Sequence, residues 1–212
     1  MADTKISALT AATSVAAADQ FAIVQSGVSK SATLAVLQSS VGAGYRNGSV
    51  TTVSAGYAAD TYLAGSSVTV PAGGWKVGSQ YWCGFDMVKT AAGTAAFTII
   101  VRMGTLGTTG DAAILTLAYA VGTAAIDTGW FEVYVDFRTV GSGTSAVIQG
   151  ITKCSHHLAA TGLHTTGASG FGLILGTSAG FNSTTQTIIG ISVNGGASFS
   201  GTNTLAQSFV LL

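Results

Sequence analysis

The sequence predicts an all-β protein, an eight-stranded antiparallel jelly-roll sandwich preceded by a small hairpin-plus-helix module. Three observations lead to this prediction. From residue 50 onward, short segments with apolar residues at every second position recur between turns rich in Gly, Thr and Ala. The same region shows no helical periodicity. The single proline, Pro71, lies at the end of a predicted strand, where it removes no hydrogen bond from a sheet. An eight-stranded up-and-down barrel is the alternative.

The N-terminal segment is expected to form the small module. An extended lead-in precedes a hairpin, with Phe21, Ile23 and Val24 on one arm and residues 25–30 as the turn, and a short helix follows around Leu34–Leu37. Such a segment has too few apolar residues to close a core by itself, so it should require a partner surface. The residues expected to dock there are Ile6, Leu9, Phe21, Ile23, Leu34 and Leu37.

A glycine-rich stretch separates this module from the rest of the chain. Residues 42–49, GAGYRNGS, contain three glycines and Asn47, which are typical of a linker or a tight turn. Their spacing matches neither the dinucleotide-binding pattern nor the P-loop, so phosphate binding is not predicted. The chain is therefore divided into a module over 1–41, a linker over 42–49 and a β-domain over 50–212.

Strands of the β-domain are expected near residues 66–70, 79–89, 95–103, 112–119, 129–138, 146–153, 170–176, 186–194 and 204–212. Two of them alternate with particular clarity. Their predicted apolar faces consist of Tyr81, Cys83, Phe85 and Met87 in the first, and of Phe97, Ile99, Val101 and Met103 in the second. One buried face and one solvated face is the pattern of a strand in an antiparallel sandwich.

The stretch WFEVYVDFR, residues 130–138, places the glutamate Glu132 and the aspartate Asp136 on one face of a strand. Four residues at the rise of a strand separate them by about 13 Å. The two carboxyl groups of a glycosidase lie about 5–9.5 Å apart. We therefore interpret the two acids as part of an exposed face, with Arg138 nearby.

The charge of the chain is low and unevenly distributed. Charged residues make up 8% of the sequence, and 8 basic residues balance 8 acidic ones. Zero net charge and the absence of basic clusters argue against nucleic-acid binding, which requires cations to displace counterions. No charged residue follows Lys153. An uncharged C-terminal region in a chain with a mean hydropathy of +0.53 favours self-association, because charge protects exposed sheet edges.

The start of the chain, MADTKISALTAAT, lacks the apolar core of a signal peptide. No apolar run approaches the roughly 18–20 residues that a membrane helix needs, so membrane insertion is not expected. Cys83 and Cys154 match no zinc or redox spacing. We interpret them as buried free thiols on strands, with a disulfide as the alternative.

Two short patterns were weighed for chemistry. GTSAG, residues 176–180, matches the nucleophile pattern around Ser178, but no Asp, Glu or His follows it in the chain, which favours a turn. The three histidines lie in HHLAATGLH, where neighbours on a strand point to opposite faces. In a symmetric trimer, either His157 or His164 would be repeated around the axis and could bind a metal. Polar loop histidines are the alternative, and no metal, cofactor or catalytic residue is predicted.

Tryptophans offer a surface for binding sugars if they are exposed. Of Trp75, Trp82 and Trp130, the last two lie on strand faces opposite the apolar ones, as does Tyr134. Trp82, Trp130 and Tyr134 therefore form a candidate glycan platform. Burial in the second sheet or at a subunit contact is the alternative, because tryptophans usually serve packing.

The residues also carry a resemblance to known proteins. Lys5–Leu9 (KISAL), Asp19–Val24 (DQFAIV) and Thr33–Leu37 (TLAVL) resemble, in order, the elements of an N-terminal attachment module of tailed-bacteriophage fibre and head-appendage proteins. Residues 91–150, with their Gly-Thr and Ala-Gly turns, are similar to the jelly-roll domain of phage virion proteins. The chain has no coiled-coil heptads and no repetitive shaft, which is more typical of a head fibre, a decoration protein or a short tail fibre than of a long tail fibre.

The resemblance implies a non-enzymatic structural protein at the virion surface, made in the host cytoplasm. The N-terminal module would dock on a capsid or tail protein, and the β-domain would form a homotrimeric surface knob or fibre. The alternative is a carbohydrate-binding module that recognises a host-surface glycan. A depolymerase is a third interpretation, which only the sparse acids Asp111, Asp127, Glu132 and Asp136 would support.

Overall fold

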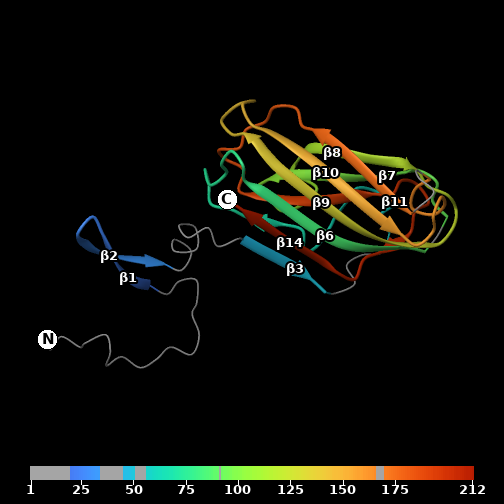
Figure 1. The fold of residues 1–212 in the computed structure, drawn as a ribbon, viewed down its shortest axis with the longest axis horizontal. Coiled ribbons are helices and arrows are strands. Elements are labelled where there is room, and N and C mark those ends of the chain that lie inside the picture. Colours follow the sequence, from blue (N-terminus) through green and yellow to red (C-terminus); the bar gives the residue numbers. More distant parts are fainter. Residues whose placement is uncertain (1–19, 34–44, 51–55, 91, 166–169) are drawn as a thin grey trace, which may run out of the picture. The chain divides into compact units, whose positions relative to one another are not determined.

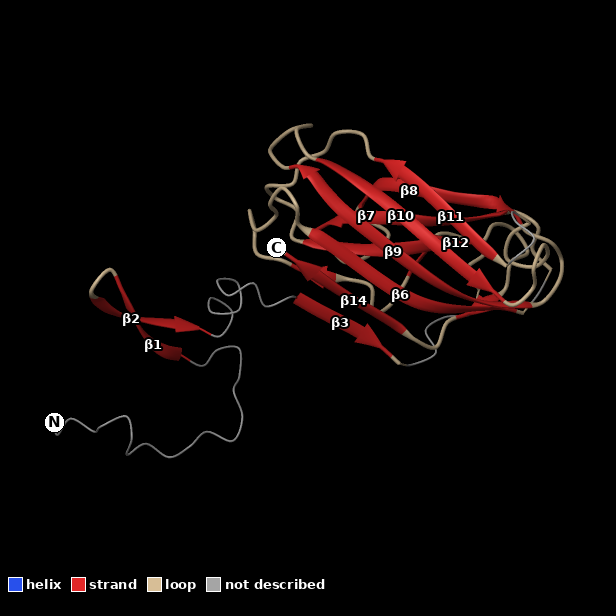
Figure 2. Ribbon diagram, viewed as in Figure 1, coloured by secondary structure: helices blue, strands red, loops and turns tan. Residues whose placement is uncertain are grey.

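The computed structural model describes residues 20–33, 45–50, 56–90, 92–165 and 170–212. Every helix or strand found in these ranges is a β-strand, as Figure 2 shows. Within the same ranges no helix is long and apolar enough to cross a membrane. The chain divides into two compact units, 1–43 and 44–212, which are described separately.

The first unit contains a β-hairpin, as predicted. Strands β1 (Gln20–Gln25) and β2 (Val28–Thr33) pair in antiparallel register up to a two-residue turn. Both turn residues, Ser26 and Gly27, have positive φ angles of 53° and 77°. Two positive φ angles define the tight hairpin turn whose twist matches that of the strands. The turn is therefore shorter than the predicted 25–30, because strand pairing continues up to it.

The residues expected to dock are only partly covered by the structure. Phe21 and Ile23 lie on β1, and Phe21 is half-buried. The other four, Ile6, Leu9, Leu34 and Leu37, lie outside the described residues, as does the helix expected around Leu34–Leu37. The docking role of all six stays a prediction.

The second unit is a sandwich of two antiparallel sheets (Figure 1). The seven-stranded sheet has the order β11-β10-β9-β6-β14-β3, with β13 also paired to β6. It contains β3 (Tyr45–Ser49), β6 (Gln80–Lys89), β9 (Asp127–Thr139), β10 (Val147–His156), β11 (Phe171–Thr177), β13 (Gly201–Thr202) and β14 (Ala206–Leu211). The five-stranded sheet has the order β4-β12-β7-β8, with β5 also paired to β12. It contains β4 (Thr61–Tyr62), β5 (Val68–Thr69), β7 (Ala96–Gly104), β8 (Ala112–Val121) and β12 (Ile188–Asn194).

The predicted all-β, antiparallel, two-sheet architecture is confirmed, but the two sheets contain seven and five strands instead of the predicted eight in all. The nine expected segments correspond to β5 to β12 and to β14, of which all but β5 are long strands. The strand β3 was not predicted, since residues 42–49 read as a linker. Its pairing with β14 and the packing of Tyr45 against the core hold this turn-like sequence in a strand. Tertiary pairing here overrides the local preference.

The core lies between the two sheets and is built from the predicted alternating faces. Phe131 of β9 stacks on Phe85 of β6 and on Phe97 of β7, with ring centroids 5.2 and 4.9 Å apart. Cys83 and Cys154 are free thiols buried in this core, as predicted. Burial raises the pKa of Cys83 to about 12, so its thiol stays protonated and unreactive at neutral pH.

Candidate functional site

The site lies on the outer face, which we define as the face of the seven-stranded sheet that points away from the core. Strand register arranges this face in rows of neighbouring side chains. The central row runs across six strands and contains Arg46, Phe209, Trp82, Tyr134, Ile151 and Leu175. The glycine row lies beside it and contains Gly48, Gln207, Gly84, Glu132, Lys153 and Leu173.

Aromatic rings of the central row lie against one another. Trp82 and Phe209 stack with ring centroids 5.3 Å apart and an interplanar angle of 26°. Tyr134 is the register partner of Trp82 on the next strand, and the Lys153 ammonium lies 4.9 Å from the centroid of its ring. Such stacks combine a large apolar area with a polar edge, which suits recognition of amphipathic ligands.

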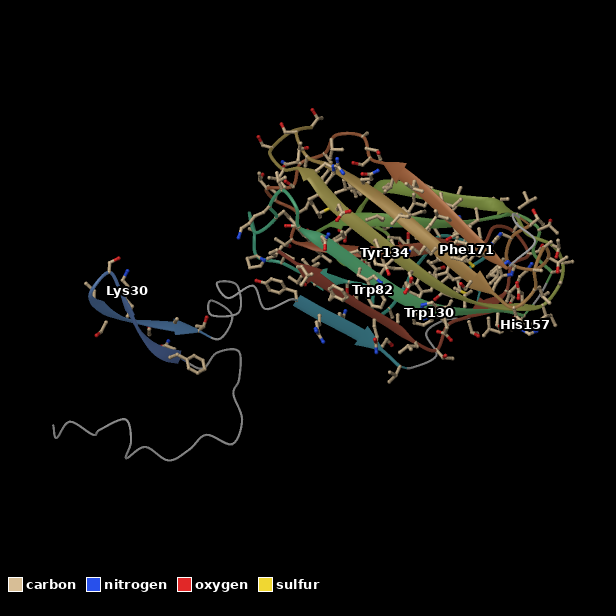
Figure 3. All side chains as sticks on the ribbon, in the orientation of Figure 1. Lys30, Trp82, Trp130, Tyr134, His157 and Phe171 are labelled. Atoms are coloured by element: carbon tan, nitrogen blue, oxygen red, sulfur yellow. The ribbon has the colours of Figure 1, made fainter. Side chains whose placement is uncertain are left out.

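The three residues of the candidate glycan platform, Trp82, Trp130 and Tyr134, all lie on the outer face, and all are half-buried (Figure 3). An added Cβ at Gly84 would lie 2.6 Å from the ring of Trp82 and 2.8 Å from that of Trp130. The two indoles therefore meet over Gly84, and only a residue without a side chain leaves them this space. Trp75 belongs instead to the core, where it stacks on Phe137 at 4.5 Å.

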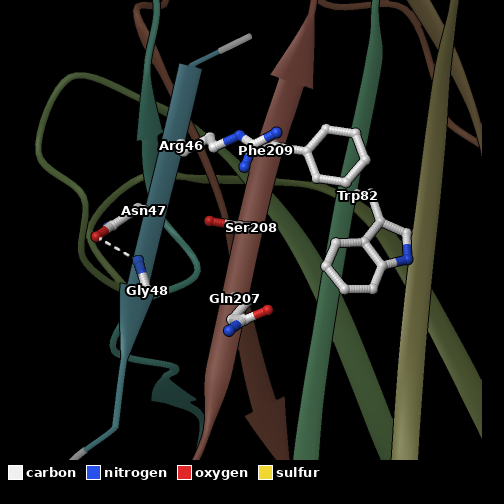
Figure 4. Close-up of a pocket in the computed structure, with 7 residues that line it drawn as sticks. All are labelled: Arg46, Asn47, Gly48, Trp82, Gln207, Ser208 and Phe209. Atoms are coloured by element: carbon white, nitrogen blue, oxygen red, sulfur yellow. Dashed lines mark hydrogen bonds between the residues drawn. The ribbon is translucent and has the colours of Figure 1, made fainter.

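A hollow opens where the glycine row meets the central row. Gln207 is exposed and has Gly48 as its register partner on one side and Gly84, which lies under the two indoles, on the other. The absence of a side chain at Gly48 leaves the space beside Gln207 open. The resulting pocket has a volume of about 390 Å³. We call it the Arg46 pocket; it is lined by Arg46, Asn47, Gly48, Trp82, Gln207, Ser208 and Phe209 (Figure 4).

A smaller pocket of about 170 Å³ lies on the other side of the Trp82–Phe209 stack. We call it the Asp136 pocket; it is lined by Gln80, Tyr81, Trp82, Tyr134, Val135, Asp136, Phe209 and Leu211. The same two stacked rings thus border both hollows. The two pockets differ in charge, since Arg46 is the only charged residue that lines the first and Asp136 the only one that lines the second.

Glu132 and Asp136 of β9 lie on the outer face, as predicted. The Tyr134 hydroxyl donates a hydrogen bond to Glu132 Oε2 at 3.3 Å, and Gln80 Nε2 donates one to Asp136 Oδ1 at 2.9 Å. Each carboxylate is thus hydrogen-bonded by a neutral side chain. Arg138 donates to Gln149 Oε1 at 3.0 Å, at the edge of the same face.

Sequence reasoning did not find Arg46, Gln207 or Phe209. Arg46 lies in the expected linker, and the two others lie on a predicted strand whose outward face was not assigned. Alternation in AQSFVL does indicate that Gln207 and Phe209 share a face. Their neighbourhood with Trp82 depends on the position of β14 between β6 and β3, which local patterns do not encode.

Of the three histidines, one is exposed and two are buried. His157 is exposed, but His164 is 1% exposed and stacks on Tyr119 with ring centroids 5.3 Å apart. A side chain buried in this way within one sandwich cannot face an axis between subunits, so the expectation for His164 is wrong. His156 is buried as well, with Nδ1 2.6 Å from Asp127 Oδ2. Across the described ranges, no group of three or more His, Cys, Asp or Glu side chains could hold a metal ion.

The nucleophile-like pattern around Ser178 lies in the loop that follows β11. The Ser178 hydroxyl accepts a hydrogen bond from the backbone amide of Ile148 at 3.0 Å, and its own amide donates to the Ile148 carbonyl at 3.0 Å. The chain then continues to β12 without a helix. The strand–turn–helix geometry of a nucleophile elbow is therefore not formed here.

No protein-family model and no curated protein matches the chain. Among solved structures, it is similar to lectin I from Ulex europaeus in complex with the methyl glycoside of α-L-fucose, with 8% identity over 79% of this chain and 98% of the lectin and a TM-score of 0.37. The lectin UEA-II complexed with galactose gives 11% identity, coverage of 80% and 93%, and a TM-score of 0.38. Infectious bursal disease virus, Gx strain, gives 13% identity, coverage of 80% and 42%, and a TM-score of 0.21. These values are too low to assign the chain to either class of protein.

Proposed function

We propose that the chain is a non-enzymatic structural protein of a tailed-bacteriophage virion. In this proposal the first unit docks on a capsid or tail protein, and a sandwich of the jelly-roll type forms a homotrimeric knob or short fibre at the virion surface. The resemblance of the N-terminal elements and of residues 91–150 supports the phage assignment. The observation that carries the self-association is the reversed amphipathicity of β11.

Of the four large apolar residues of β11, Ile174 packs against the core and the other three lie on the outward face. The inward positions of the strand include Gly172 and Gly176, whereas Phe171, Leu173 and Leu175 point outward and are 46%, 45% and 59% exposed. Strand β11 also forms an end of the seven-stranded sheet. Edge strands of soluble proteins are usually protected by charges, but no charged residue follows Lys153. A second copy of the chain is the occupant that an uncharged, apolar edge of this kind fits best.

Light scattering coupled to size-exclusion chromatography tests this self-association. We expect the wild type to be a trimer at micromolar concentration. When Leu173 and Leu175 are both changed to threonine, we expect a monomer, because threonine is well tolerated in a strand but offers less apolar area. Leu106→Thr is the matched control, because Leu106 is 64% exposed in a loop of the other sheet. A monomeric wild type, or a double variant that remains trimeric, would contradict the proposal. Imaging of intact particles would locate the chain on head or tail.

Host-glycan recognition is the second candidate function, and the two pockets beside the Trp82–Phe209 stack favour it. The larger pocket falls within the range of about 300–1,000 Å³ in which small-molecule sites usually lie. We expect the full-length protein to bind members of a glycan array, and Trp82→Ala to abolish this binding because it removes a wall from both pockets. Trp130→Ala should reduce binding less, since Trp130 lines neither pocket.

A further inference from the structure

The Arg46 pocket has a shape that follows from its sequence. Gln207 projects from the middle strand, and Gly48 on β3 leaves the space on one side of it empty. On its other side, the indoles of Trp82 and Trp130 lie over Gly84 of β6, so the Trp82 ring bounds the hollow there. An added Cβ at Gly48 would come no closer than 3.4 Å to any atom, which shows that this side of the pocket is open.

The lining of the pocket combines an apolar wall with polar groups. Trp82 and Phe209 supply the apolar wall, and Gln207 is exposed with an amide that both donates and accepts hydrogen bonds. Figure 4 shows the Arg46 side chain extending from β3 towards Phe209. A sugar ring has an apolar face and a rim of hydroxyl groups. Its face can therefore pack against the aromatic wall while its hydroxyl groups bond to the polar side chains.

Charge makes the pocket selective. Arg46 is exposed, and none of the ion pairs found in the described part of the chain involves it. No carboxylate lines this pocket. The nearest acid of the glycine row, Glu132, lies beyond β6 and has Lys153 as its register partner on the other side. The guanidinium therefore has its five donors available for an anion from solution, in the fork geometry that matches a carboxylate or a sulfate.

We infer that the Arg46 pocket binds a saccharide that carries an acidic group, with Arg46 as the residue that selects for charge. This inference rests on the glycan-recognition function proposed above. The sugar ring packs against the Trp82–Phe209 wall, Gln207 bonds its hydroxyl groups, and the acidic substituent pairs with the guanidinium. The Asp136 pocket repels the same substituent, because its only charged lining residue is a carboxylate.

The test uses the full-length protein on an array that holds carboxylated, sulfated and neutral glycans. We expect acidic glycans to be preferred, and Arg46→Met to weaken their binding about tenfold and that of neutral glycans much less, as the loss of one charge-assisted pair predicts. Arg138→Met is the matched control, because it removes the same charge from the same sheet outside the pocket. Gly48→Leu should abolish binding of all glycans by filling the hollow, and its circular dichroism spectrum verifies folding.

The outcomes separate the inference from the function on which it rests. The acidic preference is overturned if neutral and acidic glycans bind equally well and Arg46→Met changes neither. If Trp82→Ala still abolishes binding in that case, glycan recognition stands. Binding that survives Gly48→Leu in the folded protein places the ligand elsewhere and overturns the inference. If the array retains no protein at all, both proposals fail. Preference for carboxylated over sulfated members, or the reverse, identifies the acidic group.

Discussion

At the scale of single residues, Asp127 organises one end of the sandwich. Its Oδ1 accepts hydrogen bonds from the backbone amides of Thr128 and Leu158 at 2.9 and 3.2 Å. Its Oδ2 accepts one from Leu163 at 3.0 Å and lies 2.6 Å from His156 Nδ1. The sequence presented Asp127 as one of four sparse acids, and the structure gives it a role in holding the loop after β10.

Lys89, on the neighbouring strand β6, stabilises the same end of the sandwich. It is only 1% exposed, and its Nζ donates to the carbonyls of Gly93 at 2.6 Å and Gly162 at 3.3 Å, and also to that of Thr123. Burial lowers the pKa of Lys89, while Asp127, its register partner, acts in the opposite direction. The Lys89 ammonium and the Asp127 carboxylate are both hydrogen-bonded within the protein, which favours a structural role for the pair.

Changing Asp127 to asparagine should lower the free energy of unfolding by about 3 kcal/mol. An amide has only one accepting oxygen, so its NH₂ group must face backbone donors that the carboxylate now satisfies. Asp136→Asn is the matched control, because Asp136 is half-buried on the outer face, with one hydrogen bond from Gln80; it should cost under about 0.5 kcal/mol. Urea unfolding at one protein concentration measures both, and equal losses would contradict the role of Asp127.

Tyr81 should make stability depend on alkaline pH. It is 1% exposed, its hydroxyl donates to the Ser66 carbonyl at 2.7 Å, and burial raises its pKa well above the ordinary 10.0. Above pH 10 the folded state therefore binds more protons than the unfolded state, so this contribution to stability is complete below pH 10 and is lost as the pH rises further.

Tyr81→Phe removes this titration together with the hydrogen bond. At pH 8 the variant should be about 1 kcal/mol less stable than the wild type. The wild type then loses about 1.4 kcal/mol per pH unit above 10, so the two proteins should be about equally stable at pH 11. The other buried phenols titrate in both proteins and cancel in the difference. Urea unfolding at both pH values measures the gap, and a gap that stays constant would show that Tyr81 does not titrate as described.

At the scale of elements, glycines on one face explain how β10 and β11 approach β8. An added Cβ would lie 2.5 Å from Leu115 at Gly150, 2.9 Å from Leu117 at Gly176 and 2.7 Å from His164 at Gly172. The glycines leave room on the inward face of these strands for large side chains of β8 and of the loop between β10 and β11. Phe171, Leu173 and Leu175 of β11 point outward, whereas Ile174 packs against the core.

Gly172→Ala should destabilise the sandwich by about 1–3 kcal/mol, the range for overpacking of a core. Besides His164, the new methyl group would meet the Tyr119 ring at 2.9 Å, and both neighbours are buried. Gly48→Ala is the matched control on an edge strand, where the nearest atom is at 3.4 Å. Thermal unfolding distinguishes the two, and similar midpoints for both variants would contradict the close packing of β11.

The sequence was most informative about single strands and least informative about their neighbours. Alternating patterns located β6 and β7 and placed Trp82 and Tyr134 on an outward face, because a strand's period is a local property. The sheet order depends on pairing between distant segments, such as β3 with β14, and so the Arg46 pocket could not be predicted. The pairing of Asp127 with His156 could not be predicted for the same reason, since it joins neighbouring strands at one end of the sandwich.

At the scale of the whole molecule, the two units differ in whether each can be expected to fold by itself. Among the described residues, the buried cluster of the sandwich runs from Tyr57 to Val210. In the first unit, Ala32 is buried and Phe21 is half-buried. A sandwich with its own core should fold alone, whereas a two-stranded hairpin is at best marginally stable by itself and should depend on a partner.

Deleting residues 1–43 should therefore leave a folded, oligomeric sandwich that no longer attaches to particles. The cut lies before Tyr45, because β3 belongs to the seven-stranded sheet and its loss would expose β14. Circular dichroism and light scattering report on the sandwich, and decoration of particles that lack the chain reports on attachment. Loss of the β-sheet signal on truncation would make the first unit part of the sandwich fold, and decoration by the truncated protein would move attachment into the sandwich.

Phe21→Asp in the full-length chain should reproduce the attachment defect without any deletion. Phe21 is half-buried on β1 and is one of the residues expected to dock, so the substitution would bury an unpaired charge in the contact, at a cost of about 3–5 kcal/mol. Ser29→Asp is the matched control, because Ser29 is exposed on β2 and adds the same charge to the hairpin outside the expected contact. We expect this control to decorate particles normally. Equal decoration by both variants would separate the hairpin from docking and leave the segments around it as the attachment element.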